Sequence, residues 1–138
     1  MRTEGDYPSL DYFKKYSWYL RALNTKIAEN SKINSDISRG LLSRDTVDPE
    51  WQRSNKREIR RLKAKMQEIV YTINSIPDRF DLIPCKLFLR LHYVLGLNLT
   101  ETAEKLNVSQ STVRRIRDRA SRYFENYPFD EKDGEASK

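Results

Sequence analysis

Residues 97–124 carry two short amphipathic helical patterns separated by a single turn. Asn98, followed three residues later by Glu101, has the spacing of a capping box, which predicts the start of a helix. Asn107 stands where this first pattern ends, and Asn tolerates the left-handed backbone conformation that a tight turn requires. Ser109 then offers a hydroxyl cap for a second helix. The segment therefore predicts a helix, a tight turn and a second helix.

The second of these helices has one apolar face and one polar face. Val113, Ile116 and Ala120 recur at spacings of three and four, so they share the inward face. The opposite face carries Ser111, Arg114, Arg115, Asp118 and Arg122. Such a face could simply be the solvated side of a helical hairpin. The coincidence of a short first helix, a tight turn and an arginine-bearing outer face instead favours a helix-turn-helix that enters DNA.

We expect this second helix to lie in the major groove of double-stranded DNA, with its N-terminal half at the base edges and its flanks at the phosphates. The candidate DNA-binding residues are Ser109, Gln110, Ser111, Thr112, Arg114, Arg115, Asp118, Arg119 and Arg122. Arg117 lies near the edge of the apolar face, and its side chain could extend to a phosphate or to an acidic neighbour.

The motif A-E-K-L-N-V-S-Q-S-T-V-R-R-I at 103–116, with Arg119 and Ala120 beyond it, resembles region four of bacterial sigma factors. With its helical N-terminal portion included, the whole chain resembles the ArpU/RinA group of phage-encoded transcriptional regulators. That resemblance implies an activator of phage late genes, with RNA polymerase as a possible partner. Two positions depart from the pattern: Thr102 stands where an apolar residue is common, and Asn107 where Gly is frequent.

The charge balance agrees with a polyanionic partner. The chain has 26 basic and 20 acidic side chains, and its formal net charge is +6. Between Pro84 and Phe124 the basic side chains outnumber the acidic ones clearly, so the excess lies on the proposed DNA-binding segment.

Two long helical patterns precede this segment. The first begins near Ser9 and places apolar side chains at alternating spacings of three and four, namely Phe13, Tyr16, Leu20, Leu23 and Ile27. The second opens with Asp48 as a cap and Pro49 at the first helical position, and Pro77 stops it. Its apolar stripe is Ile59, Leu62, Met66, Ile69, Ile73 and Ile76. Neither helix can bury its stripe alone.

The two long helices must therefore pair with each other as a hairpin, with a second copy as a coiled coil, or both. The second of them also carries a cluster of cations, namely Arg53, Lys56, Arg57, Arg60, Arg61, Lys63 and Lys65. This cluster is typical of the solvated outer face of a coiled coil. The alternative is a second surface that contacts phosphates.

A third pattern, from Ile83 to Leu95, precedes the helix-turn-helix, and Gly96 is placed to end it. We expect it to be the helix that supports the two short ones. His92 within it is interpreted as a scaffold residue, and Cys85 as a small core residue.

Motifs of the common enzyme classes are absent from the sequence, which has no Gly-rich phosphate loop, no G-x-S-x-G and no H-E-x-x-H. The one cysteine and the one histidine do not make a metal site at their spacing. We therefore expect no enzymatic activity, no cofactor and no metal. The first ten residues lack the apolar run of a signal peptide, and no stretch matches a membrane span, so we expect a cytoplasmic protein.

Together these patterns predict an all-α protein with a helical hairpin or coiled coil for self-association at 1–77, a sigma-region-four-like helix-turn-helix at 78–126 and an acidic disordered tail at 127–138. The expected function is sequence-specific regulation of transcription by a homodimer or higher oligomer. Two other functions fit the patterns. One is a DNA-packaging component resembling a small terminase subunit, in which the DNA-binding helices usually come first. The other is a helical adaptor that binds only protein.

Overall fold

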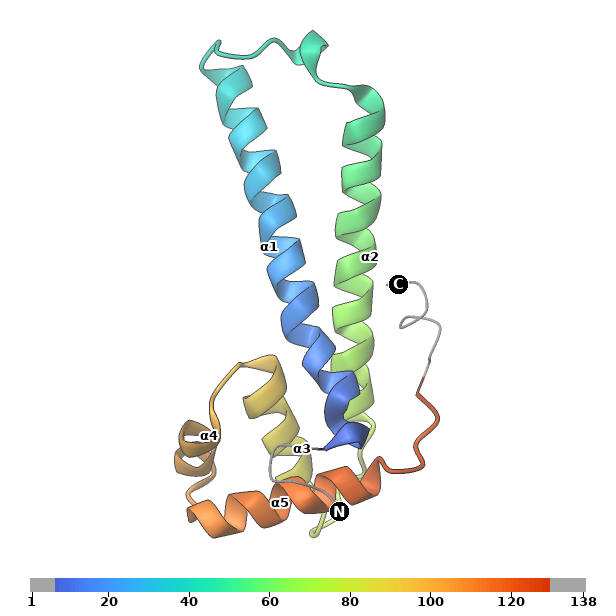
Figure 1. The fold of residues 1–138 in the computed structure, drawn as a ribbon, viewed down its shortest axis with the longest axis vertical. Helices are drawn as coiled ribbons and strands as arrows, with labels where there is room; N and C mark the ends of the chain where they lie inside the picture. The colour runs from blue at the N-terminus through green and yellow to red at the C-terminus, as the bar shows by residue number, and fades with distance from the viewer. Residues whose placement is uncertain (1–6, 130–138) are drawn as a thin grey trace. The chain divides into compact units, whose positions relative to one another are not determined.

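The computed structural model describes residues 7–129, and this range contains helices and no strand (Figure 1). In chain order the elements are η1 (Pro8–Leu10), α1 (Asp11–Ser38), η2 (Arg44–Thr46), α2 (Pro49–Asn74), α3 (Ile83–Leu89), η3 (Arg90–Val94), α4 (Leu99–Leu106) and α5 (Gln110–Tyr123). The predicted all-α fold, with a long helical hairpin before a helix-turn-helix, is thus confirmed.

The chain divides into two compact units. The first, called here the hairpin unit, comprises Tyr16–Thr72. The second, called here the helix-turn-helix unit, comprises the residues before 16 together with those from 73 onward. The sequence placed this boundary at residue 77. The structure differs because residues 8–15 and 73–77 belong to the same compact unit as the helix-turn-helix.

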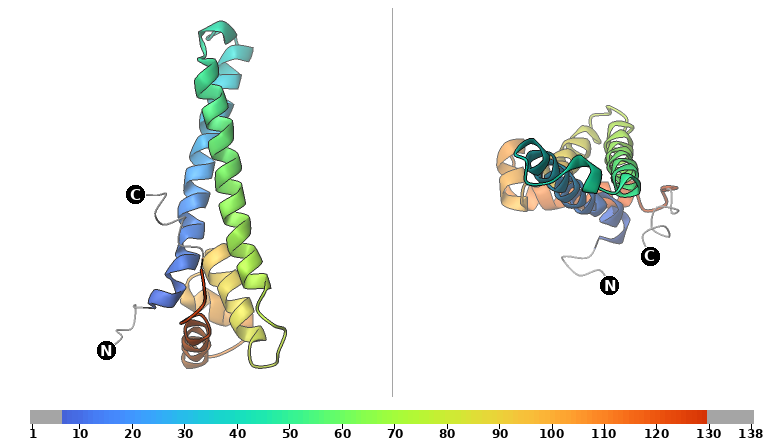
Figure 2. Two further views of the ribbon diagram at one scale, coloured as in Figure 1. Left: turned by 90° about the vertical axis from the view of Figure 1, so that its right-hand side faces the viewer. Right: turned by 90° about the horizontal axis from the view of Figure 1, so that it is seen from above.

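In the hairpin unit, α1 and α2 run antiparallel and are joined by the segment that contains η2 (Figures 1 and 2). The Asp48 carboxylate accepts a hydrogen bond of 2.9 Å from the amide of Glu50, which confirms the cap predicted before Pro49. The helix ends at Asn74, two residues before the predicted end at Ile76.

The buried stripe of α1 differs from the predicted one. Tyr19 and Leu23 are buried, whereas Leu20 and Ile27 are 36% and 43% exposed. The side chain of Asn55 on α2 donates a hydrogen bond to that of Asn30 on α1, so the stripe of α1 continues through Asn30. The assignment of Leu20 and Ile27 to the buried seam was therefore wrong, because both residues lie at its edge.

The core of the helix-turn-helix unit gathers side chains from both ends of the chain. Leu10 and Phe13, at the start of α1, are fully buried. The ring of Phe13 makes an edge contact with that of Phe124, at 5.0 Å between ring centres. This packing explains why the first residues of α1 belong to this unit.

The expected tail begins later than residue 127. The rings of Tyr127 and Phe129 lie 4.9 and 5.5 Å from that of Phe124, so both residues are packed. Residues 130–138, which hold the acidic part of the expected tail, lie outside the described residues.

Candidate nucleic-acid interface

The first short helix, α4, begins with the predicted capping box. The side-chain oxygen of Asn98 accepts a hydrogen bond of 2.8 Å from the amide of Glu101. The Glu101 carboxylate accepts one of 2.9 Å from the amide of Asn98. Thr102 is fully buried, and its hydroxyl donates to the Asn98 carbonyl at 2.8 Å. This polar residue therefore fits where an apolar one was expected, because its hydroxyl has a partner.

The turn between the two short helices depends on one left-handed residue. Asn107 has φ 58° and ψ 48°, and among the described residues it is the only non-glycine with positive φ. The amide of Val108 donates to the carbonyl of Ala103 at 3.0 Å, which satisfies a carbonyl at the helix end. The prediction that Asn107 makes this turn is confirmed.

Ser109 caps α5, as predicted. Its side-chain oxygen accepts a hydrogen bond of 3.1 Å from the amide of Thr112. Its hydroxyl also lies 3.2 Å from that of Ser111. These contacts fix the first turn of α5, which is the part of a recognition helix that approaches base edges.

The support predicted over 83–95 consists of α3 followed by the π-helical turn η3. The amide of Leu95 donates to the carbonyl of Arg90, five residues back, and Gly96 has φ 77°. The Nδ1 atom of His92 lies 2.8 Å from the Leu97 carbonyl, and its ring stacks on that of Phe88. Burial lowers the pKa of His92 below its usual range, so the packed ring favours its neutral form.

Cys85 of α3 is part of the same scaffold. Its side chain is 1% exposed, and its thiol donates a weak hydrogen bond to the Ile116 carbonyl at 3.7 Å. Burial raises the pKa of the thiol, so Cys85 is an inert core residue and not a nucleophile.

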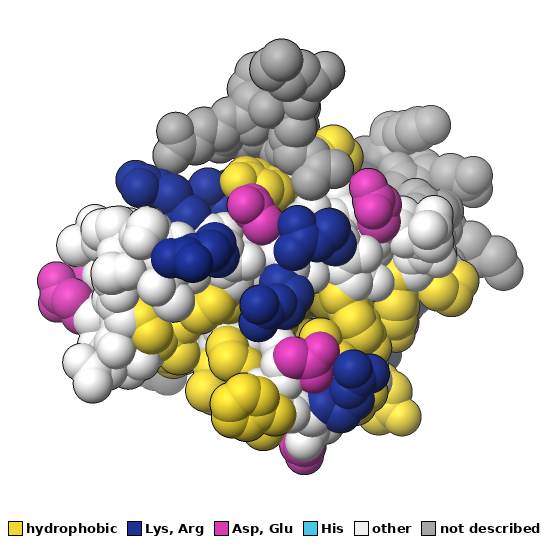
Figure 3. All heavy atoms as spheres, turned by 90° about the horizontal axis from the view of Figure 1, so that it is seen from below, with side chains coloured by type: hydrophobic (Ala, Val, Ile, Leu, Met, Phe, Trp, Pro, Cys, Tyr) yellow, Lys and Arg dark blue, Asp and Glu magenta, His cyan; other side chains and the backbone are white. Residues whose placement is uncertain are grey.

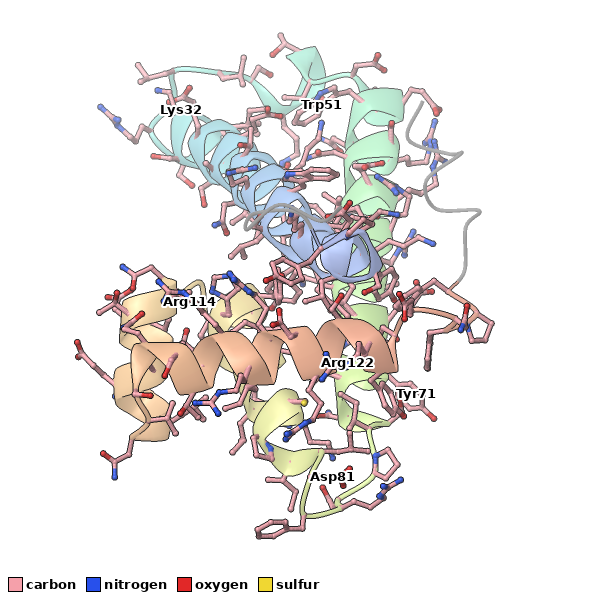
Figure 4. The ribbon with its side chains drawn as sticks, turned by 60° about the horizontal axis from the view of Figure 1, so that its bottom comes forward. Lys32, Trp51, Tyr71, Asp81, Arg114 and Arg122 are labelled. Carbon is pink, nitrogen blue, oxygen red and sulfur yellow. The ribbon has the colours of Figure 1, made fainter. Side chains whose placement is uncertain are left out.

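The inner face of α5 is buried as predicted, with Val113 and Ala120 fully covered and Ile116 6% exposed. The exposed candidate residues are Ser109, Ser111, Arg114, Arg115, Arg119 and Arg122. The half-buried ones are Gln110, Thr112 and Asp118. Figure 4 shows Arg114 near one end of α5 and Arg122 near the other, so arginines are available along most of its length.

The arginines on α5 differ in what they contact. Arg119 donates a hydrogen bond of 3.2 Å to the carbonyl of Asp81, in the loop before α3. Among the described residues, no acidic side chain pairs with Arg115 or Arg122. These two exposed guanidinium groups can therefore bind an external anion without breaking an internal ion pair. Figure 3 shows Lys and Arg side chains gathered on one face beside hydrophobic ones.

Arg117 and Asp118 are engaged by the segment before α1. The guanidinium carbon of Arg117 lies 4.3 Å from the centre of the Tyr7 ring. Burial and a hydrogen bond to the Asp118 carboxylate raise the pKa of the Tyr7 hydroxyl. The sequence did not reveal this contact, because no local pattern links Tyr7 to a helix so far along the chain.

A shallow groove lies beside the outer face of α5, with a volume of about 370 Å³. It is lined by Pro84, Leu87, Leu106, Val108, Thr112, Arg115, Ile116 and Arg119. Arg115 and Arg119 are its charged residues. The described part of the chain holds no group of His, Cys, Asp and Glu suited to a metal ion. Among the described helices, none has an apolar stretch that could span a membrane.

Comparison with known proteins agrees with this geometry. Residues 86–122 match the family model for sigma-70, region 4, a range that includes α4, the Asn107 turn and most of α5. The match covers well under half of the chain. No curated protein and no solved structure matches it significantly. The predicted sigma-region-four-like helix-turn-helix is thus confirmed, and this segment is a DNA-binding module by type.

Proposed function

We propose that this protein is a sequence-specific regulator of transcription that places α5 in the major groove of double-stranded DNA. The observation that carries the proposal is the exposed, arginine-bearing face of α5. A capped turn and the support helix α3, which is buried at Cys85, Phe88 and Leu89, hold that face within a segment similar to sigma-70 region 4. The helix is 14 residues long, about 21 Å at 1.5 Å per residue, which suits one pass through the major groove.

The exposed residues divide by their position along α5. Ser111, Arg114 and Arg115 lie in its first half, where a recognition helix meets base edges, and bidentate arginine contacts select guanine. Arg119 and Arg122 lie in the second half and suit phosphates. Ser109, Gln110 and Thr112 stand at the rim of the first turn. Asp118 contributes through its bond to Tyr7, which steadies the helix.

The finer biological role follows from the resemblance of the whole chain to ArpU/RinA regulators. We propose an activator of phage late genes that acts in the cytoplasm and contacts RNA polymerase. The match of residues 86–122 to sigma-70, region 4 supports RNA polymerase as the partner.

The hairpin unit supports a role in self-association. Its buried apolar side chains are few, namely Tyr19, Leu23, Leu62 and Ile69. A groove between α1 and α2 is lined by Tyr16, Leu23, Lys63, Met66, Gln67 and Val70. Leu20 and Ile27, at the edge of the buried stripe of α1, are also exposed. Two long helices with this little buried core need further helices to cover them.

We propose that a second copy of the hairpin unit covers the apolar part of this groove, at Tyr16, Leu23 and Met66, and leaves Lys63 and Gln67 accessible at the rim of the interface. The 26 residues of α2 span about 39 Å, and two neighbouring helices present a face about 20 Å wide. That face measures about 800 Å² per copy, which is the size a stable protein–protein interface needs. A dimer would also place two reading helices on one duplex, which a single helix-turn-helix needs for useful specificity.

Selection of bound sequences from a random duplex library tests the proposal, followed by mapping of the bound sites in the genome that encodes the protein. We expect one enriched motif with two half-sites, located at promoters. Enrichment at a single packaging site away from promoters would favour the packaging role. Absence of any enrichment would contradict sequence-specific binding and favour the protein-binding adaptor.

A further inference from the structure

The cations of α2 form two sets that differ in their partners. Arg53 and Arg57 both contact the Glu50 carboxylate, at 2.7 and 3.5 Å. Arg61 pairs with Glu58 at 2.7 Å, and the hydrogen bond from Arg61 lowers the pKa of Glu58. These pairs make the charge of that side of the helix mixed, as expected of a solvated face.

The second set consists of cations of α2 whose charge no acidic side chain within residues 7–129 neutralises. Lys56, Arg60 and Lys63 are exposed, and none of them pairs with an acidic side chain among the described residues. Their spacings of four and three residues place them on one side of α2. Gln67 and Tyr71 continue the same side at spacings of four, and Tyr71 is 77% exposed.

We call Lys56, Arg60, Lys63, Gln67 and Tyr71 the α2 strip. At 100° per residue its members fall within roughly 80° of arc, and no acidic residue lies within that arc between positions 56 and 71. Lys63 and Gln67 also border the groove between α1 and α2, so the strip runs along the flank of the helix beside its buried stripe. Figure 4 shows Tyr71 near the lower end of α2. The strip is therefore a continuous row of hydrogen-bond donors.

The length and chemistry of the strip match a nucleic acid backbone. It spans about 22 Å at 1.5 Å per residue, and one DNA strand carries about six phosphates over that length of duplex axis, at about 3.4 Å of rise each. Arg, Lys, Gln and Tyr are side chains that contact phosphate and sugar oxygens. The strip has no carboxylate that would repel the phosphates of such a backbone. The side of α2 that carries Glu50 and Glu58 would repel them.

We propose that the α2 strip binds the sugar-phosphate backbone of double-stranded DNA without regard to sequence. This second site goes beyond the reading function of α5 and does not depend on it. The strip adds affinity and salt dependence, while α5 supplies the choice of sequence.

The test compares two triple variants of the full-length chain. The strip variant is Lys56→Gln, Arg60→Gln and Lys63→Gln. The matched control is Arg57→Gln, Arg61→Gln and Lys65→Gln, which lowers the net charge equally at cations that have acidic partners outside the arc of the strip. Fluorescence anisotropy with a random-sequence duplex of about 40 base pairs, between about 50 and 200 mM salt, gives the affinity and its salt slope. Circular dichroism checks that both variants keep their helices.

We expect the strip variant to reduce the slope of log affinity against log salt by about 2 to 3, since each phosphate contact contributes about 0.9. The affinity of the strip variant for the duplex at about 50 mM salt should fall at least about tenfold, because several phosphate contacts are lost. The control should change the slope by less than about 1, the value of a single contact. Equal effects of both variants, or no effect of the strip variant, would overturn the proposal.

Two further measurements separate this proposal from others. If the strip variant keeps its DNA affinity but loses binding to vesicles containing phosphatidylserine, the strip binds lipid and the proposal is wrong. The Arg115→Ala and Arg122→Ala double variant tests α5 alone on the same duplex. If the α5 variant keeps the wild-type salt slope and the strip variant loses it, the result supports DNA binding by the strip. This holds even if α5 proves not to read DNA.

Discussion

The guanidinium group of Arg117 lies over the ring of Tyr7, with its central carbon 4.3 Å from the ring centre. Nearby, the hydroxyl of Ser9 donates a hydrogen bond of 2.7 Å to the Ser121 carbonyl. The segment before α1 thus contacts α5 at two positions, Arg117 and Ser121. The orientation of the recognition helix depends on residues at the opposite end of the sequence.

Replacement of Tyr7 by Ala should destabilise the helix-turn-helix unit. The change removes the ring from Arg117, whose Nε atom is buried without a hydrogen-bond partner, and a cation–π contact of this kind contributes about 1 kcal/mol. Urea unfolding measures the loss. Tyr7→Phe keeps the ring and serves as the control. If it destabilises as much as Tyr7→Ala, the hydroxyl and not the ring carries the contact.

Asn107 should accept Gly and reject a β-branched residue. Its φ of 58° lies in the left-handed region, where Gly is unstrained and most other residues lose about 1 to 2 kcal/mol. We expect Asn107→Gly to leave the thermal midpoint unchanged or to raise it. Asn107→Val should lower the midpoint by several degrees, which corresponds to a strain of about 1 to 2 kcal/mol. A thermal midpoint that is the same for both variants would show that the turn relaxes to another conformation.

Stability should fall as the pH is lowered below about 6.5, the usual pKa of histidine. Burial lowers the pKa of His92 in the folded chain, so at mildly acidic pH the unfolded chain takes up a proton that the folded chain does not. Neutral His92 makes its full contribution to the free energy of unfolding above the pKa that His92 has in the unfolded chain. This contribution is lost as the pH falls through the lower pKa that His92 has in the folded chain. Urea midpoints at pH 7.5 and 5.5 measure the effect. His92→Gln should remove most of the difference, because the chain has one histidine.

Two substitutions on α2 should separate folding from self-association. Ile69 is 1% exposed, so Ile69→Asp would bury an unpaired carboxylate and should unfold the hairpin unit. Met66 lines the groove between α1 and α2, so Met66→Asp should convert a dimer into a monomer while the helix content remains. Sedimentation equilibrium and circular dichroism distinguish the outcomes. A wild-type monomer at micromolar concentration that still binds DNA tightly would contradict the dimer.

Local signals in the sequence predicted the ends of the helices well. The Asn98–Glu101 box, the Asn107 turn and the Ser109 cap all depend on side chains that reach only a few residues along the chain. The cap before Pro49 is of the same kind. Such contacts can be predicted without knowing the rest of the fold.

Contacts between distant parts of the chain could not be predicted in this way. A spacing of three and four residues in α1 is compatible with two adjacent stripes, and only the opposite helix selects Tyr19 and Asn30 over Leu20 and Ile27. The contact of Tyr7 with Arg117 has no local signal at all. In the sequence the cations of α2 likewise form a single cluster. In the folded helix, ion pairs divide this cluster into cations with acidic partners in the described range and cations without them.

The central claim is that the outer face of α5 binds duplex DNA, and the affinity of α5 variants for a duplex selected by the wild-type protein tests it most directly. Arg115→Ala should cost about 1 to 3 kcal/mol on this duplex and less on random DNA. Alanine at Ser111, Arg114, Arg115 and Arg122 together should abolish the preference for the selected duplex while the thermal midpoint stays near that of the wild type. Unchanged affinity in that quadruple variant would contradict the account.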